Sequence, residues 1–227
     1  MNPESSAGSP FWEQPEIVGR FAARDPDHRL ARLVEEYPDP GAVRVLDLGC
    51  AGGRNSVFLA ERGFDVTALD LSTAMVAETR LRVAVVLGPE EAERRVRVGA
   101  MDRLDTIADG SIDLIVALGV YHAARSGKEW EASLSESNRV LSAGGRVLVA
   151  IHTAEFRPDD RIPIPVPGET HVYDGLASGR SFLVDADTLD RDMARHGLSP
   201  VVPTDTVRRE TEGGGRRVTA NGLYVKP

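Results

Sequence analysis

The sequence has a single cysteine, Cys50, among its 227 residues, so no disulfide can form within the chain. It has no apolar run near the roughly 20 residues that a membrane-spanning helix needs. The first residues, MNPESSAGSPFWEQ, have neither the basic start nor the apolar stretch of a signal peptide. Together these absences predict a cytoplasmic protein that does not associate with a membrane.

Positive charge is also scarce, because 27 Lys and Arg residues stand against 35 Asp and Glu residues, for a formal net charge of −8. A protein that binds nucleic acid usually presents a dense basic patch. The arginines that do gather, near residues 94–97 and 208–217, lie among acids or beside a glycine turn, and we interpret them as solvated strand ends. No Cys and His residues have the spacing of zinc ligands. We therefore expect neither a nucleic-acid partner nor a metal site.

Apolar runs and helical patterns alternate along most of the chain. Strands are predicted at residues 43–48, 65–70, 95–100, 112–118 and 146–152, and helices at 54–62, 72–87, 128–141 and 187–196. Two further strand-like runs, 204–210 and 217–225, flank three consecutive glycines and predict a closing hairpin. Such an alternation predicts an α/β fold with a mostly parallel sheet.

The two ends of this pattern and one internal segment differ from the rest. Residues 1–10 are rich in Ser, Pro and Gly and are expected to be disordered, whereas 11–227 are expected to form a single domain. Residues 11–40 predict short N-terminal helices or a lid. The segment 154–184 holds four prolines near its start, and it leaves the carboxyl end of a strand, where open α/β sheets bind ligands. We interpret it as a substrate cap.

The most informative motif is a strand, a glycine turn and a helix in the run VRVLDLGCAGGRN. Asp47 lies near the end of the strand, and Gly49 and Gly53 lie in the turn. A carboxylate, Asp70, ends the next strand about 20 residues after Gly49, which is the distance expected for an acid that binds a ribose. Because the glycine spacing is not G-x-G-x-x-G, the motif disfavours a nicotinamide dehydrogenase.

The block LDLGCAGGRN resembles the first motif of the class I, Rossmann-like S-adenosylmethionine-dependent methyltransferases. Those enzymes usually have D-x-G-x-G-x-G, so Ala51 replaces the middle glycine. The resemblance covers about residues 40–153 and implies a three-layer sandwich around a seven-stranded, mostly parallel sheet with one antiparallel C-terminal strand. It also implies S-adenosyl-L-methionine as the cofactor, and the GRN sequence resembles the branch of the family that methylates small molecules and metalloids.

In the resembled family, the glycine turn binds the methionine part of the cofactor and the acid after the second strand binds the ribose. Asp47 would accept hydrogen bonds from the amino group or structure the loop, while Cys50 is interpreted as a small packing residue. Arg54 would meet the cofactor carboxylate or a helix-packing acid. The candidate cofactor-binding residues are Asp47, Gly49, Cys50, Ala51, Gly53, Arg54, Asn55, Asp70, Leu71, Met101, Asp102 and Leu118.

The adenine end of the cofactor has its own candidates within this set. Leu71 and Met101 would offer apolar surfaces to the ring, and Asp102 would accept a hydrogen bond from the exocyclic amine. The alternative for Asp102 is a solvent-exposed acid at a strand end.

Three residues are candidates for the chemistry itself. The turn Leu118-Gly119-Val120-Tyr121-His122 leaves the fourth strand, and in the resembled enzymes this turn passes beside the sulfonium. His122 is a candidate base because imidazole titrates near neutral pH, and Tyr121 could orient the acceptor. His152, at the end of the fifth strand, is a second candidate base. The alternative interpretation is a packed tyrosine and a structural histidine.

Three hypotheses of function follow. The first is a methyltransferase acting on a small molecule, since the Asn/Asp-Pro-Pro-Tyr sequence of many DNA and protein-glutamine methyltransferases is absent where ALGVYH stands. The second keeps the cofactor but uses it for cyclisation or aminocarboxypropyl transfer. The third is a noncatalytic cofactor-binding protein. The sequence predicts neither the acceptor nor the oligomeric state.

Overall fold

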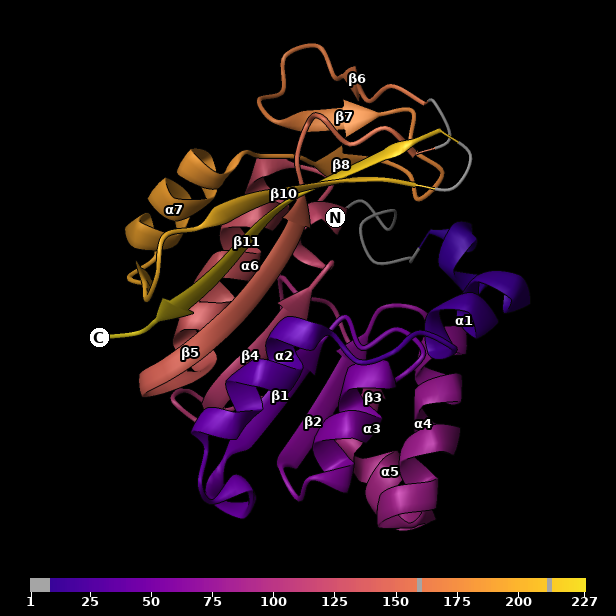
Figure 1. The fold of residues 1–227 in the computed structure, drawn as a ribbon, viewed down its shortest axis with the longest axis vertical. Helices are drawn as coiled ribbons and strands as arrows, with labels where there is room; N and C mark the ends of the chain where they lie inside the picture. The colour runs from indigo at the N-terminus through magenta and orange to yellow at the C-terminus, as the bar shows by residue number, and fades with distance from the viewer. Residues whose placement is uncertain (1–8, 159–160, 212–213) are drawn as a thin grey trace. The chain divides into compact units, whose positions relative to one another are not determined.

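The computed structural model describes residues 9–158, 161–211 and 214–227 (Figure 1). Its contacts divide the chain into two compact units: unit 1 holds residues 1–100 and 112–116, and unit 2 holds residues 101–111 and 117–227. The disorder predicted for residues 1–10 falls mostly outside the described residues. Ser9 caps a short 3-10 helix, η2 (Pro10–Glu13), by accepting from the backbone N–H of Phe11.

Unit 1 is built on a parallel sheet with the strand order β4-β1-β2-β3. These strands are β1 (Arg44–Leu48), β2 (Asp65–Asp70), β3 (Val96–Val98) and β4 (Ile112–Leu118), whose last two residues belong to unit 2. After Arg44, every residue of β1 is buried, as expected for a strand covered on both faces. The bounds predicted for β2 and β4 are confirmed.

The helices of unit 1 follow the predicted alternation with one addition. They are α1 (Pro15–Ala22), α2 (His28–Leu33), η3 (Val34–Glu36), η4 (Pro40–Ala42), α3 (Arg54–Glu61), α4 (Thr73–Leu87) and α5 (Pro89–Arg95). Ser72 caps α4, because its hydroxyl accepts from the N–H of Met75 at 3.1 Å. The helix α5 is absent from the predicted elements. Pro89 begins this helix instead of only ending the previous one, and the predicted third strand shrinks to three residues.

In unit 2 the strand order is β10-β11-β5-β4. Here β5 (Leu141–His152) pairs antiparallel with β11 (Arg216–Val225), which also pairs antiparallel with β10 (Asp205–Glu210) and with the short β9 (Ser199–Pro200). The predicted class, an α/β fold with a mostly parallel sheet and one antiparallel C-terminal strand, is confirmed. The strand β5 begins earlier than predicted, directly after α6 (Gly127–Val140).

Aromatic side chains fill the core of unit 2 around α6, the 3-10 turn η5 (Tyr121–Ala123) and α7 (Ala186–Arg195). Trp130 is fully buried, and its indole N–H donates to Asp192 at 2.9 Å. The ring of Phe182 stacks on Trp130 with a centroid separation of 4.6 Å. This packing joins both helices to the segment predicted as a cap.

The segment 154–184 contains a small antiparallel sheet of its own. Its strands are β6 (Ile164–Pro165), β7 (Val172–Asp174) and β8 (Ser181–Phe182), in that order (Figure 1). A cleft of about 570 Å³ is lined by residues of this segment, α6 and α7, among them the charged Glu131, Arg191 and Arg195. None of the predicted site residues lines it. That the segment covers a substrate stays a prediction.

Candidate active site

The glycine turn after β1 is held to β2 by two backbone hydrogen bonds. The N–H groups of Gly49 and Cys50 both donate to the carbonyl of Leu69, at 2.8 and 2.9 Å. Gly49 and Gly53 have φ values of +73° and +80°, a region that favours glycine. Gly53 directly precedes α3, and no described side chain caps that helix. Its first N–H groups are therefore available to a ligand.

Ala51, the departure from the family's middle glycine, adopts the left-handed conformation with φ +49°. Both polar groups of its backbone are bound. The N–H donates to Asp70 Oδ2 at 2.9 Å, and the carbonyl accepts from the Thr79 hydroxyl at 2.6 Å. These two bonds offset the cost of about 1–2 kcal/mol that an L-residue incurs in this conformation. The turn therefore has at residue 51 a backbone conformation that favours glycine, although the residue is alanine.

Asp70 ends β2 with its carboxylate fixed at both oxygens. Oδ2 accepts from the N–H of Ala51 and Oδ1 from the N–H of Ser72, each at 2.9 Å. Burial raises the pKa of this carboxyl, against the lowering effect of these two hydrogen bonds. Since a carboxylate oxygen can accept more than one hydrogen bond, each oxygen keeps capacity for a hydroxyl. The half-buried Leu71 follows directly.

Asp47 lies beneath the turn, with only 2% of its surface exposed. Its Oδ2 accepts from the Ser56 hydroxyl at 2.5 Å, and burial raises its pKa to about 6. This bond ties β1 to α3, which is the loop-structuring role considered for Asp47. Cys50 is also buried, and burial followed by the charges of Asp70 and Asp47 raises the pKa of its thiol. It packs as predicted.

Arg54 and Asn55, the first residues of α3, both contact the chain between α1 and α2. Arg54 donates to the carbonyl of Asp25 at 3.3 Å, and Asn55 Oδ1 accepts from the N–H of Asp27 at 3.1 Å. These bonds give both residues a structural task. Their predicted contact with a cofactor stays a prediction.

The segment around η2 contributes residues that are not among the predicted site residues. The Glu13 carboxylate accepts from the N–H groups of Thr73 and Ala74, at 3.1 and 3.0 Å, and so caps the start of α4 directly after Asp70. The carbonyl of Trp12 accepts from the Ser72 hydroxyl at 3.1 Å. The only sequence signal was the predicted lid over residues 11–40. The partner of Glu13 is about 60 residues away and could not be read from the pattern.

Three of the predicted cofactor residues belong to unit 2. Met101 is buried, and the half-buried Asp102 lies near enough to Glu129 for its charge to add to the burial that raises the pKa of Glu129. Leu118 ends β4, and Gly119 follows with φ +96° and an N–H that donates to the carbonyl of Ala150 at 2.8 Å. The other nine candidates lie in unit 1.

Tyr121 is fully buried. Its hydroxyl lies 2.7 Å from the Ser137 hydroxyl, and burial raises the pKa of the phenol above its usual range. Its ring also packs edge-to-face against Trp130. This environment favours the packed-tyrosine interpretation.

His122 and His152 form a contacting pair. Their ring centroids are 4.3 Å apart, and the backbone N–H of His152 donates to His122 Nδ1 at 3.4 Å. Phe156 packs edge-on against His152 at 3.8 Å. Removal from solvent, and then the charge of Arg217, lowers the pKa of His122 to about 4. Burial, then His122 and Arg217, hold the pKa of His152 well below its usual value. Both imidazoles are therefore neutral at pH 7.

Two further features bear on the class of site. Within the described ranges, no cluster of three or more His, Cys, Asp or Glu residues could hold a metal ion. No helix in the described part of the chain is long and apolar enough to cross a membrane.

Comparison with known proteins finds a matching family model and similar proteins. A family model described as a methyltransferase domain matches residues 45–145. The demethylmenaquinone methyltransferase of Beutenbergia cavernae is 38% identical over 107 residues, which are 47% of this chain and 40% of that protein. The chain thus spans less than half the length of this relative.

Two solved structures share the fold. A methyltransferase from Methanosarcina mazei that depends on S-adenosylmethionine superposes with a TM-score of 0.65 at 16% identity, covering 89% of this chain and 99% of that one. The 1,6-didemethyltoxoflavin N1-methyltransferase of Burkholderia thailandensis, with its substrate and S-adenosylhomocysteine bound, has a TM-score of 0.59 at 20% identity. That match covers 93% of this chain and 80% of that one.

The chain therefore has the fold of these methyltransferase structures, with the glycine turn after β1 held to the Asp70 carboxylate at the end of β2. Residues 45–145 of the chain match the methyltransferase domain, and the chain shares the fold of solved methyltransferases.

Proposed function

We propose that this protein transfers a methyl group from S-adenosyl-L-methionine to a small-molecule acceptor. The observation that carries the proposal is the Asp70 carboxylate, which is fixed through both oxygens between the glycine turn and the start of α4. A carboxylate held in this way can accept from two neighbouring hydroxyls without reorganising, as a ribose requires.

The residues of unit 1 fit the cofactor. The uncapped start of α3 offers N–H groups to the carboxylate of the methionine part, and Asp47 offers a buried acceptor below the turn. A side chain at Gly53 would lie 3.0 Å from the Thr79 methyl group, so the turn has little spare room on that side. When bound, the cofactor supplies a methyl group that is activated by positive sulfur.

Methyl transfer requires the protein to align the acceptor with the methyl group, to exclude water and to accept a proton from the acceptor. An acceptor hydroxyl, ammonium or acidic C–H loses a proton as it is methylated, and a neutral imidazole can take it. His122 and His152 are the candidates of unit 2 for this role, since both are held neutral. We propose His122 as the base and His152 as its neighbour in the acceptor site.

A small acceptor is supported by four observations. The net charge is −8, the segment 154–184 forms a small sheet beside a cleft, and relatives include enzymes named for demethylmenaquinone and for ubiquinone biosynthesis. A structural neighbour is named as the N1-methyltransferase of 1,6-didemethyltoxoflavin. We further propose that the protein acts in the cytoplasm and without a nucleic-acid partner.

Product analysis by mass spectrometry tests the reaction. The purified protein is incubated with S-adenosylmethionine and a panel of thiol, amine, hydroxyl and metalloid acceptors. Methyl transfer yields S-adenosylhomocysteine together with an acceptor that has gained a methyl group. Methylthioadenosine instead would indicate cyclisation or aminocarboxypropyl transfer. The absence of cofactor binding in calorimetry would contradict both methyl transfer and these alternative reactions.

A further inference from the structure

The pairing of β5 with β11 places Arg217 on the same face of the sheet as His152. In the antiparallel register, His152 is opposite Thr219, and residues directly opposite one another share a face. Arg217 lies two residues before Thr219 and therefore points to that face as well. Its charge contributes to lowering the pKa of both His152 and His122. The guanidinium thus acts on both imidazoles.

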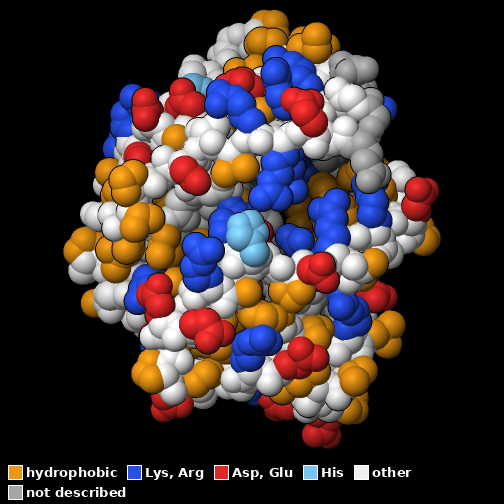
Figure 2. All heavy atoms as spheres, in the orientation of Figure 1, with side chains coloured by type: hydrophobic (Ala, Val, Ile, Leu, Met, Phe, Trp, Pro, Cys, Tyr) orange, Lys and Arg blue, Asp and Glu red, His pale blue; other side chains and the backbone are white. Residues whose placement is uncertain are grey.

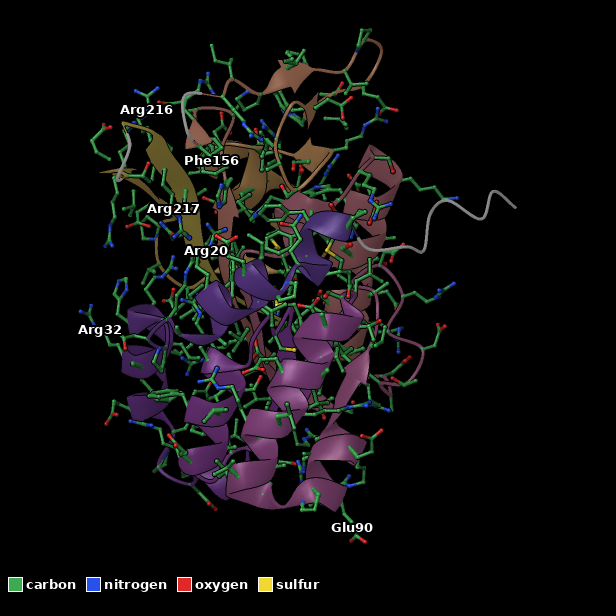
Figure 3. The ribbon with its side chains drawn as sticks, turned by 90° about the vertical axis from the view of Figure 1, so that its right-hand side faces the viewer. Arg20, Arg32, Glu90, Phe156, Arg216 and Arg217 are labelled. Atoms are coloured by element: carbon green, nitrogen blue, oxygen red, sulfur yellow. The ribbon has the colours of Figure 1, made fainter. Side chains whose placement is uncertain are left out.

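The segment after β5 brings Phe156 to the same place. The backbones of Arg157 and Arg216 exchange two hydrogen bonds of 2.8 Å, which sets this segment alongside β11 (Figure 3). Phe156 precedes Arg157 and packs on the His152 ring, whereas Arg217 follows Arg216. Two imidazoles, a phenyl ring and a guanidinium therefore gather at the carboxyl end of β5.

Positive charge is concentrated here, in contrast with the chain as a whole. Arg208 on β10 pairs with Glu155 at 2.8 Å, and Arg157 and Arg216 also lower the pKa of Glu155, after the larger effect of Arg208. Arg209 is directly opposite Arg217. Basic side chains also gather in groups on the face drawn in Figure 2, although the net charge is −8. The arginines interpreted from the sequence as solvated strand ends include one, Arg217, that faces the histidines.

A guanidinium beside two candidate bases has an electrostatic cost. It opposes the positive charge that either imidazole would gain by accepting a proton. An acceptor with an acidic group would remove this conflict, because its negative charge would pair with the guanidinium. The exposed position of Arg217 leaves it within reach of such a group.

We propose that the acceptor is a flat, acidic small molecule whose carboxylate is bound by Arg217 while its body lies against His122, His152 and Phe156. This inference rests on the proposed methyl transfer for the identity of the acceptor, but the anion site can be tested without it. Arg217 would then determine specificity, and the two histidines would lie next to the atom that is methylated.

A binding experiment tests the site directly. The imidazole Cε1–H resonances, assigned with His122→Asn and His152→Asn, are followed by NMR as benzoate, phenyl phosphate or benzamide is added. We expect benzoate to shift both resonances and benzamide to leave them in place. Arg217→Gln should weaken benzoate binding by about 10- to 100-fold, the usual loss of a charged hydrogen bond. Phenyl phosphate binding more tightly than benzoate would overturn the assignment to a carboxylate.

The matched control is Arg146→Gln, since Arg146 lies in the middle of β5, six residues before His152 and across from Val225 on β11. This variant should bind benzoate as the unaltered protein does. Equal shifts with benzamide and benzoate, or unchanged benzoate affinity in Arg217→Gln, would overturn the inference.

Turnover provides the second readout. Hydroxy- and aminobenzoates are compared with the matching benzamides as acceptors, and release of S-adenosylhomocysteine is measured. We expect kcat/KM to favour the acids by about 10- to 100-fold, Arg217→Gln to abolish this preference, and Arg217→Lys to restore part of it. An acid-to-amide ratio that is the same in Arg217→Gln would contradict the proposal. If neither series is methylated, the proposed methyl transfer to such acceptors is wrong. The NMR titration alone then tests the anion site.

Discussion

Asp47 should make the stability of the unliganded protein depend on pH in a way that a single substitution can isolate. Burial raises the pKa of this carboxyl from 3.8 to about 6. Because the folded-state pKa lies above the unfolded one, the contribution of Asp47 to stability is fully present below pH 4. It is lost as pH rises through 6. A shift of about two units corresponds to roughly 3 kcal/mol.

The substitution Asp47→Asn preserves an oxygen that can accept from Ser56 but removes the ionisation. Near pH 4 the variant and the unaltered protein should unfold with similar free energies. At pH 7.5 the variant should be the more stable by up to about 3 kcal/mol, since it no longer holds a buried charge. Taking the difference between the two proteins cancels other titrating groups.

The assay is urea denaturation of both proteins, without cofactor, at several pH values between 4 and 7.5. The difference in the free energy of unfolding should grow between pH 4 and pH 7. A difference that stays constant over this range, or an Asn variant that is less stable at pH 7.5, would refute the reasoning.

Three further predictions concern the turn and the proposed base. Gly52→Ala should destabilise the protein by about 1–3 kcal/mol and expose α1 to trypsin, because the new Cβ would lie 2.7 Å from the Ala22 backbone. The control is Gly19→Ala, whose new Cβ would have no atom within 4 Å. Ala51→Gly should raise the melting temperature slightly or leave it unchanged, since the left-handed φ costs alanine about 1–2 kcal/mol; a marked loss would show that the strain is absent. His122→Ala should lower kcat by about 100-fold or more while leaving S-adenosylhomocysteine affinity unchanged in calorimetry; unaltered kcat would make His122 structural.

The alternation of strands and helices could be predicted from local patterns, and the exceptions have local causes. The helix predicted at 72–87 ends before Gly88-Pro89, but proline also suits the first turn of the next helix, and Glu90 and Arg95 fit the dipole of α5. The Ser-Ala-Gly-Gly run at 142–145 lies between the helix predicted at 128–141 and the strand predicted at 146–152. Instead, β5 passes through it, with Gly144 at φ +76°.

The candidate site also has a part that could be predicted from the sequence and a part that could not. The turn and Asp70 are close in sequence and follow a known spacing, so both could be predicted. The partners of Glu13, and the gathering of His152, Phe156 and Arg217, depend on strand register and on contacts between distant segments. No periodicity in one sequence carries that information.

The central claim is that Asp70 holds the ribose of S-adenosylmethionine. Isothermal titration with S-adenosylhomocysteine measures this most directly, using the unaltered protein, Asp70→Asn and Asp65→Asn, which changes an acid at the opposite end of the same strand. We predict binding by the unaltered protein and by Asp65→Asn, and a loss of about 10- to 100-fold or more in Asp70→Asn. Equal affinity in Asp70→Asn, with a melting temperature that shows it is folded, would contradict the account.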